Sequence, residues 1–296
     1  MRETVSQLMK IIFPKFDKVG MPLLGLAAAA FFILESRKQL RKRTRPKIER
    51  LLENGSVAAV ALPALRLLLV PGMYAAAKLA QQQKFGLFHW LKLPQWLRYG
   101  AGFLLLDYTN YFWHVLLHKS DWLWRFHNVH HSDLDLDLST AWRFHIGENF
   151  ASVPYRSAAI ALLGAPASLV LFYEVIFEGC TAFHHSNIRL PFKAEQRLNR
   201  VLVTPRMHGI HHSIVAREAN SNFSVIFSWW DRLHQSLRLN VPQDEIIIGV
   251  PAYREAAEQS PKNLFLMPFA PQRTWQLPDG TVPEREKRYP PEHLCP

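Results

Sequence analysis

The sequence contains little cysteine: Cys180 and Cys295 are the only two among 296 residues. They form no CxxC pair, and two cysteines cannot build a disulfide framework, which excludes a small disulfide-stapled fold. The chain also lacks the CxxCH haem-attachment motif, the cysteine spacing of iron–sulfur proteins and the GxGxxG dinucleotide fingerprint. Any redox reaction at this chain would therefore need electrons from a separate donor protein.

Acidic residues are also scarce, with 24 Asp and Glu against 35 Lys and Arg, and the net charge is +11. A basic chain can bind nucleic acid, but here the basic runs flank apolar stretches and form no known binding motif. The densest run places eight Lys or Arg between Arg37 and Arg50. Such short basic loops are typical of the cytoplasmic side of membrane spans, so we expect no nucleic-acid partner.

Hydrophobic residues make up 49% of the chain and concentrate in four stretches, residues 19–34, 57–80, 96–117 and 151–177. A helix that crosses a membrane needs about 20 apolar residues. The fourth stretch is interrupted at residues 164–166 by Gly-Ala-Pro, which breaks helices. Each half then spans only about 19 Å at the helical rise, less than the roughly 30 Å hydrocarbon core. We therefore expect a hairpin that begins and ends on one side of the bilayer.

These stretches predict an all-α fold, a polytopic membrane helical bundle with a histidine-rich helical cap on the cytoplasmic side. We divide the chain into an N-terminal transmembrane region (1–100), a histidine-rich domain that includes the membrane hairpin (101–237) and a C-terminal cap and tail (238–296). The last region is rich in proline, since ten of the 20 prolines follow Leu237.

Ten of the fourteen histidines fall into four tight groups, and their spacing is the main functional signal. Spacings of three and four residues bring side chains to one face of a helix. The groups are HVLLH (His114, His118), HNVHH (His127, His130, His131), HH (His184, His185) and HGIHH (His208, His211, His212). A single HxxxH pair is most often packed or solvated, but four groups together predict a metal site.

Neutral imidazole binds divalent iron, zinc, copper and nickel. One ion accepts four to six ligands, so eight or more clustered histidines indicate two ions. Structural zinc sites favour cysteine, and the HExxH motif of zinc hydrolases is absent. A histidine-rich site beside a bilayer suits iron and dioxygen chemistry on an apolar substrate. Two alternatives stay open: a non-catalytic metal-binding or metal-transport membrane protein, and a membrane zinc hydrolase.

The segment from Asp107 to Arg232 resembles the fatty acid hydroxylase superfamily, also called the sterol desaturase family, in its bacterial-type members. The motifs that carry the resemblance are DYTNYFWHVLLHKSDWLWRFHNVHH, FHHSNIRLP and VTPRMHGIHHSIVAREANSNFSVIFSWWDRL. The chain departs from the family pattern at Ile146, where proline is usual, and at Ser224, where glycine is usual. Neither departure removes a histidine.

The resemblance implies a membrane-bound di-iron oxidoreductase that uses O2 and external electrons to hydroxylate or desaturate a C–H bond of a fatty acyl chain, a sterol or a related lipid. The metal ligands it implies are His114, His118, His127, His130, His131, His185, His208, His211 and His212. His184 is an alternative ligand. Asp107, Glu148 and Asn187 match positions that hold ligands in place. We assign His145, one turn from Glu148, to the same supporting set, while a ligand role for it stays open.

The resemblance also implies a location and partners. It implies an integral protein of the bacterial inner membrane whose active site faces the cytoplasm, a lipid substrate taken from the bilayer, and a separate electron-donor protein. Residues 101–237 would form the di-iron hydroxylase domain. The sequence leaves open which lipid is oxidised, at which carbon, and whether the product is a hydroxyl group or a double bond.

Overall fold

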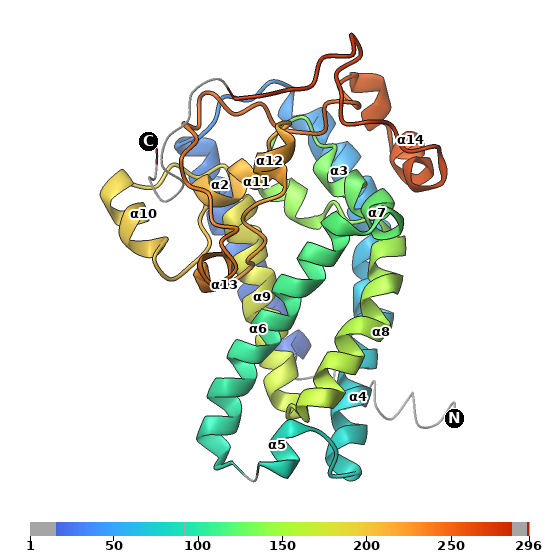
Figure 1. Cartoon of the computed structure of the whole chain (residues 1–296), viewed down its shortest axis with the longest axis vertical. Coiled ribbons are helices and arrows are strands. Elements are labelled where there is room, and N and C mark those ends of the chain that lie inside the picture. The colour runs from blue at the N-terminus through green and yellow to red at the C-terminus, as the bar shows by residue number, and fades with distance from the viewer. Residues whose placement is uncertain (1–15, 92, 286–294, 296) are drawn as a thin grey trace.

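The computed structural model describes residues 16–91, 93–285 and 295, and these fold into helices joined by loops (Figure 1). Within the described residues, β pairing is limited to three isolated bridges. The predicted all-α class is therefore confirmed. The first 15 residues of the predicted N-terminal region and residues 286–294 of the predicted tail lie outside the described part of the chain.

The first apolar stretch forms α2 (Met21–Arg37), preceded by the π-helical turn η1 (Phe16–Gly20). Its side chains pack little against the rest of the protein, and Leu26 is 69% exposed. A helix that is apolar on all sides and mostly unburied needs an apolar surrounding medium. The segment Lys18–Arg37 is accordingly one of three in the described chain that are long and apolar enough to cross a membrane.

The second stretch lies within a continuous helical segment made of α3 (Lys47–Ala64), η2 (Leu65–Leu69) and α4 (Val70–Gln82). Pro63 lies inside α3, and its missing N–H interrupts the regular ladder. The π-helical turn η2 follows directly and absorbs this interruption. The segment Lys47–Trp90 is the second candidate membrane span.

The third stretch forms α6 (Gln95–Lys119), a helix of 25 residues. At 1.5 Å per residue this length suffices to cross a bilayer. Its composition, however, excludes it from the three candidate spans of the described chain, and Asp107, Asn110 and His114 lie buried along it. The third apolar stretch thus forms a helix whose polar face packs inside the bundle.

The fourth stretch forms α8 (Ile146–Leu163) and α9 (Ala167–His185), which run in opposite directions from a turn at the lower end of Figure 1. The predicted break is confirmed: Gly164 caps α8 in the left-handed conformation, with φ of 67°, which costs glycine little. The arms of 18 and 19 residues are longer than expected, about 27 to 28 Å. Both helices continue past the apolar residues into polar ones, which the cap buries. α9 is the third candidate membrane span.

Two glycines bring the turn before α5 (Leu87–Trp90) onto the hinge of this hairpin. Gly86 has a φ of +101°, and a Cβ built there would lie 2.4 Å from the backbone nitrogen of Gly164. No residue with a side chain fits at this contact. The two backbone segments therefore pack directly on each other at the end of the bundle remote from the cap.

The bundle core lies between α4, α6, α8 and α9. Met73, Leu106, Ile160 and Tyr173 represent these four helices in one buried apolar cluster. Within a bilayer, helices associate through close packing of such side chains rather than through exclusion of water. This cluster fixes the spacing of the helices that carry histidines at their upper ends.

Short helices form a cap at the upper end of Figure 1. Its elements are α7 (Asp121–His131), η3 (Leu138–Trp142), α10 (Phe192–Leu198), α11 (Pro205–His211), α12 (Ala216–Ala219), α13 (Trp229–Leu233), η4 (Ala256–Gln259), α14 (Pro261–Leu266) and η5 (Met267–Phe269). Part of the proline-rich region packs on this cap. The Trp275 indole, for example, donates to the backbone oxygen of Ile214 at 2.7 Å.

Buried arginines attach the cap to the bundle. Arg50, which is 0% exposed, donates to both Asp133 carboxylate oxygens at 3.0 and 2.7 Å and also pairs with Asp137. Burial alone would raise the pKa of Asp133, but Arg50 and Arg143 outweigh it and hold this pKa below its ordinary value. Since charges this deeply buried are stable only when paired, the network locks the turn after α7 onto α3.

Two further arginines extend this attachment to the helices that carry histidines. Arg143 donates to the backbone oxygen of Val129, within α7, at 2.7 Å and to Asn54, on α3, at 2.8 Å. Arg41 donates to the backbone oxygen of Pro205, the first residue of α11, at 3.2 Å. The basic run that the sequence assigns to the cytoplasmic side of the membrane is thus partly a structural element of the cap.

Candidate metal centre

Two consecutive helices carry the first five clustered histidines. His114 and His118 lie in the last turns of α6, and HNVHH forms the end of α7. The Ser120 side chain caps α7 by accepting from the Leu123 N–H at 3.5 Å. The polypeptide therefore reverses between α6 and α7 at a single residue, which sets the two histidine faces against each other.

The other histidines arrive from distant parts of the sequence. His184 and His185 end α9, while His208 and His211 lie on α11 and His212 follows it. Pro205 stands at the first position of α11, where its missing N–H costs nothing. The fold thus brings the ends of four helices to one place.

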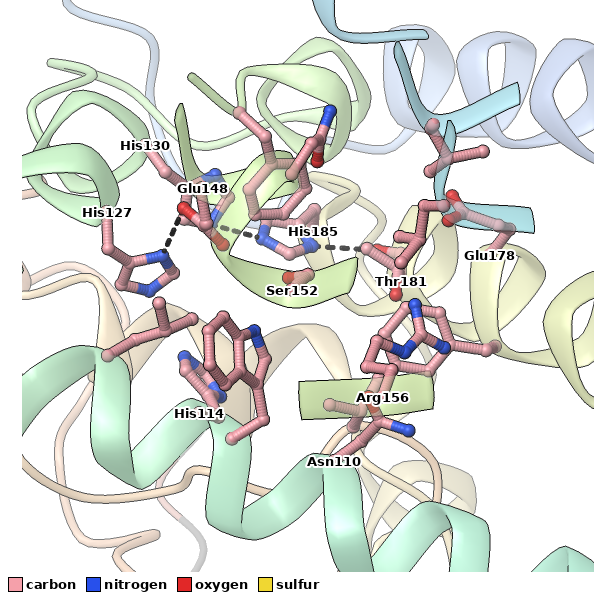
Figure 2. Close-up of a pocket in the computed structure, with 18 of the residues that line it drawn as sticks. Asn110, His114, His127, His130, Glu148, Ser152, Arg156, Glu178, Thr181 and His185 are labelled. Carbon is pink, nitrogen blue, oxygen red and sulfur yellow. Dashed lines mark hydrogen bonds and ion pairs between the residues drawn. The ribbon is translucent and has the colours of Figure 1, made fainter. Parts of the chain in front are cut away.

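Nine histidines form two compact groups there. Within each group, the potential ligand atoms all lie within 4.8 Å of one another. The first group contains His114, His118, His127, His131 and His211, and the second contains His130, His185, His208 and His212. These nine residues are the ones that the sequence predicts as metal ligands, and their role as ligands stays a prediction. Figure 2 shows four of them, His114, His127, His130 and His185, around one cavity.

The second group fits a metal ion by its distances. Its Nε2 atoms are 3.0 Å apart between His185 and His130, 3.0 Å between His208 and His185, and 3.1 Å between His212 and His208. Metal–imidazole bonds of about 2.0–2.1 Å place neighbouring ligand atoms about 3.0–3.4 Å apart. An imidazole nitrogen offers one proton or one lone pair, so the Nε2 of His185 cannot form ordinary hydrogen bonds with both neighbours. A shared cation accounts for all three contacts.

The first group fits a metal ion by its unused nitrogens. Four of its buried Nε2 atoms have no hydrogen-bond partner among the described residues, those of His118, His127, His131 and His211. A buried polar atom without a partner is costly. A metal ion bound between these atoms would satisfy all four.

The opposite ring nitrogens are held by hydrogen bonds that fix the rings. The Nδ1 of His114 contacts the Phe223 backbone oxygen at 2.8 Å, and that of His211 contacts the Ser221 oxygen at 2.7 Å. The Nδ1 of His127 contacts the Glu148 carboxylate at 3.0 Å. Such contacts leave Nε2 as the free nitrogen and are typical of metal-bound histidine.

Two other predicted supporting residues act at a distance from the rings. Asp107 accepts from the Ile226 and Phe227 backbone N–H groups at 3.3 and 3.1 Å and from the Trp230 indole at 2.7 Å. It therefore holds the loop that supplies the Phe223 oxygen. Asn187 holds the end of α9 by accepting from the Arg41 backbone N–H at 2.8 Å.

His145 and His184 lie outside the two groups. His145 caps α8 by accepting from the Gly147 N–H at 3.0 Å, and its Nε2 contacts the Phe265 backbone oxygen at 3.3 Å. His184 packs against His208, with ring centroids 4.1 Å apart, and its Nδ1 contacts the Val225 oxygen at 3.2 Å. Both are placed to support neighbouring segments.

Burial keeps the cap histidines neutral. It lowers the pKa of His131 well below the ordinary value, and the neighbouring His212 and His211 lower it further. Burial likewise lowers the pKa of His208, with His184 and His185 as further causes. A neutral imidazole is the form that binds a metal ion.

A cavity extends from the histidines into the bundle. Its histidine side includes His114, His127, His130 and His185, and its other side carries polar residues such as Asn110, Arg156, Glu178 and Thr181 (Figure 2). Apolar side chains close the rest of the wall, among them Leu65, Leu69, Trp113, Leu117 and Phe177. The arrangement can therefore hold an organic molecule beside the candidate metal centre.

Several residues of the centre were not found from the sequence. Phe144 stacks on His130, with ring centroids 4.4 Å apart and planes 10° apart, and Trp124 packs on His118 at 5.1 Å. Arg143 fixes α7 through Val129, as described above. No local spacing marks these residues, because each contact joins segments whose pairing exists only in the folded chain.

Comparison with known proteins gives a consistent result. The fatty acid hydroxylase family matches residues 99–236. An ornithine lipid hydroxylase of Rhizobium tropici is 30% identical over 45% of this chain and 39% of its own length. Human cholesterol 25-hydroxylase is 28% identical over 51% of this chain and 60% of its own length. An alkylglycerol monooxygenase of Danio rerio is 30% identical over 64% of this chain and 42% of its own length. No solved structure matches the chain.

The match to these curated relatives spans between about two fifths and three fifths of their length. The family match over residues 99–236 includes all nine histidines of the two groups. The resemblance of the sequence to the fatty acid hydroxylase superfamily is confirmed over residues 99–236, just under half of the chain.

Proposed function

We propose that this protein is a membrane-bound di-iron enzyme that hydroxylates a C–H bond of a lipid. The observation that carries the proposal is the division of nine buried histidines into two groups, each compact enough to hold one ion. The family match and the candidate membrane spans support the same reading. Hydroxylation is preferred over desaturation because the three relatives described above are named hydroxylases or monooxygenases.

The reaction requires a partner. Hydroxylation inserts one oxygen atom of O2 into the C–H bond and releases the other as water, which consumes two electrons and two protons. An iron pair would supply the reductive activation of dioxygen that acid–base groups cannot provide. Since the sequence has no dinucleotide, haem or iron–sulfur motif, the electrons come from a separate redox protein.

The chain's own residues hold and shield this site. Glu148 and the carbonyl oxygens of Phe223 and Ser221 orient the rings of the first group. Phe144 and Trp113 help to close the cavity against water, which strengthens polar interactions within it. The protein thereby supplies orientation and a dry pocket, while the cofactor supplies the reactivity.

The alternatives are less consistent with the geometry. A zinc hydrolase needs a carboxylate base at a metal-bound water. Of the two carboxylates in the cavity lining, Glu148 contacts the ring of His127 and Glu178 lies about 10 Å along α9 from His185. A metal transporter needs ligands strung along a path, whereas His131, His211 and His212 are at most 1% exposed beneath the cap. A transporter also leaves the cavity beside the histidines unexplained.

We further propose that the cap faces the cytoplasm of a bacterial cell and the bundle lies in the inner membrane. The basic run after α2 supports this orientation. Reporter proteins fused after Leu138 and after Leu190 should both report the cytoplasm, because the α8–α9 hairpin lies between these points. Reporters on opposite sides would contradict the hairpin arrangement.

The function is tested by combining metal analysis with oxygen labelling. The purified protein should contain about two iron ions, and membranes supplied with a reductase, an electron donor, a lipid extract and labelled O2 should place label in a lipid hydroxyl group. His131→Ala and His212→Ala, one in each group, should lose bound iron and activity, whereas His89→Ala, outside both groups, should keep both. A new double bond with label only in water would indicate a desaturase. Product formed without O2 would exclude an oxygenase.

A further inference from the structure

The cavity beside the histidines has a polar wall within the bundle that the proposed chemistry does not use. Thr181 lies on α9 one turn before His185, and Glu178 lies nearly one turn earlier. Asn110 lies on α6 one turn before His114, and Arg156 projects from α8. Figure 2 shows these four side chains across the cavity from His114 and His127.

This wall contains a polar group that lacks a partner. The Thr181 hydroxyl lines the cavity, is buried and has no hydrogen-bond partner among the described residues. Arg156, by contrast, is paired with Glu174, which lies outside the lining. A buried hydroxyl without a hydrogen-bond partner is costly, and a ligand in the cavity could supply that partner.

The charges of the wall are unequal. The cavity lining carries two carboxylates, Glu148 and Glu178, and one guanidinium, that of Arg156, which is already paired with Glu174 outside the lining. An anionic ligand group would therefore meet an unfavourable field, while a cationic group could pair with Glu178. The Thr181 hydroxyl can accept a hydrogen bond from the same group.

A second cavity adjoins this one and is almost entirely apolar. It lies between α2, the Pro63 region and α9. Its lining includes one guanidinium, that of Arg66, and apolar side chains such as Leu24, Leu62, Leu67 and Ala182. Leu65 and Glu178 line both cavities. Glu178 thus stands where an apolar compartment suited to a hydrocarbon chain meets a polar compartment suited to a head group.

We propose that Glu178 and Thr181 form a head-group site for an amphiphile with a cationic amine, whose hydrocarbon chain occupies the cavity between α2 and α9. The helical rise places Thr181 about 6 Å and Glu178 about 10 Å along α9 from His185. The oxidised carbon therefore belongs to the head group or lies within a few bonds of it. This inference deepens the proposed function and rests on it for the oxidation step, but the binding site itself is independent of turnover.

The test measures binding without turnover. The full-length, iron-loaded protein in detergent is titrated with three 18-carbon probes that bear bromine on the chain and end in an amine, an alcohol or a carboxylate. Bromine quenches tryptophan, and Trp113 and Trp142 line the two cavities. The amine should bind about tenfold more tightly than the carboxylate, which corresponds to about 1.4 kcal/mol. Glu178→Gln should remove most of this preference.

Two controls keep the outcome specific. Glu284→Gln, an exposed residue outside both cavities, should leave the preference unchanged. Thr181→Val should weaken amine binding without disturbing His185, because His185 contacts the backbone oxygen of residue 181 and not its hydroxyl. This variant also provides a readout should Glu178→Gln fail to fold.

The outcomes separate this inference from the function. Equal or tighter binding of the carboxylate would overturn the head-group site, as would an amine preference that survives both Glu178→Gln and Thr181→Val. In either case, iron content and label in a lipid hydroxyl group could still support the oxygenase. An amine preference in a protein that oxidises no lipid would instead uphold the site and reject the proposed function.

Discussion

At the residue scale, most of the assigned Nδ1 contacts in the candidate centre use backbone oxygens. The partners of His114, His185 and His211 are the carbonyls of residues 223, 181 and 221. Substitution of those residues does not remove a carbonyl, so these supports tolerate changes of side chain. Glu148 is the exception, because its support of His127 comes from a side chain.

Because the partner of His127 is a side chain, substitution of Glu148 tests directly what this contact contributes to a predicted metal ligand. Glu148→Gln keeps the size of the side chain but replaces a charged acceptor with a neutral one. We expect iron affinity or activity to fall by about 10- to 100-fold, the usual effect of losing such a partner. Competition with a chelator, followed by iron analysis, measures the change.

The control is Asn149→Asp, the neighbouring position on α8. Its side-chain amide donates to the Ala61 backbone oxygen at 2.9 Å and forms no hydrogen bond to a histidine ring among the described residues. This variant should disturb local packing without releasing iron. Equal iron retention in Glu148→Gln and the unmodified protein would show that His127 needs no charged partner.

The sequence predicted the histidines but not their scaffold. Spacings of three and four residues are enough to place His127, His130 and His131 on one helix face. Arg50 and Arg143 carry no such local signal, because their partners at Asp133 and Val129 are remote in sequence. From the sequence of a basic run alone, a buried arginine that forms ion pairs cannot be distinguished from an exposed one.

At the element scale, the hairpin depends on the contact between Gly86 and Gly164. The break itself could be predicted from Gly-Ala-Pro, since each residue type disfavours a continuing helix. The full length of α8 and α9 could not be predicted in the same way, because the polar ends of these helices are helical only where the cap buries them. Local hydropathy identifies the part of a helix that lies in the membrane, while tertiary packing determines where the helix ends.

Gly86→Ala should destabilise the hairpin end of the bundle. The added Cβ would lie 2.4 Å from the Gly164 nitrogen, and the φ of +101° is strained for any side chain. We expect a loss of about 1–3 kcal/mol, seen as a lower melting temperature of the detergent-solubilised protein. Gly100→Ala is the matched control, because a Cβ there meets nothing within 4 Å and alanine favours a helix. Equal melting temperatures for the two variants would contradict the close contact.

At the scale of the whole molecule, the cap is held by charges that come from the start of the chain. Arg50→Gln should leave Asp133 and Asp137 buried without their guanidinium. Removal of one partner of a buried ion pair costs about 3–5 kcal/mol. We expect a lower unfolding temperature and loss of bound iron, measured on the same purified sample.

Lys42→Gln is the control for this change, since Lys42 belongs to the same basic run but is exposed. It removes the same unit of charge from the same basic run. A similar loss of stability in both variants would attribute the effect to the net charge of this run. A loss confined to Arg50→Gln assigns it to the buried pairing.

The buried arginines also set the limits within which this protein can be divided or recombined. Residues 99–236 contain every histidine of the two groups, yet Arg41 and Arg50, which hold α11 and the turn after α7, precede that segment. A fragment trimmed to the family match would lose both supports. A chimaera that transplants the histidines into another membrane chain must therefore carry residues 35–54 with them, so the smallest transferable unit is discontinuous in sequence.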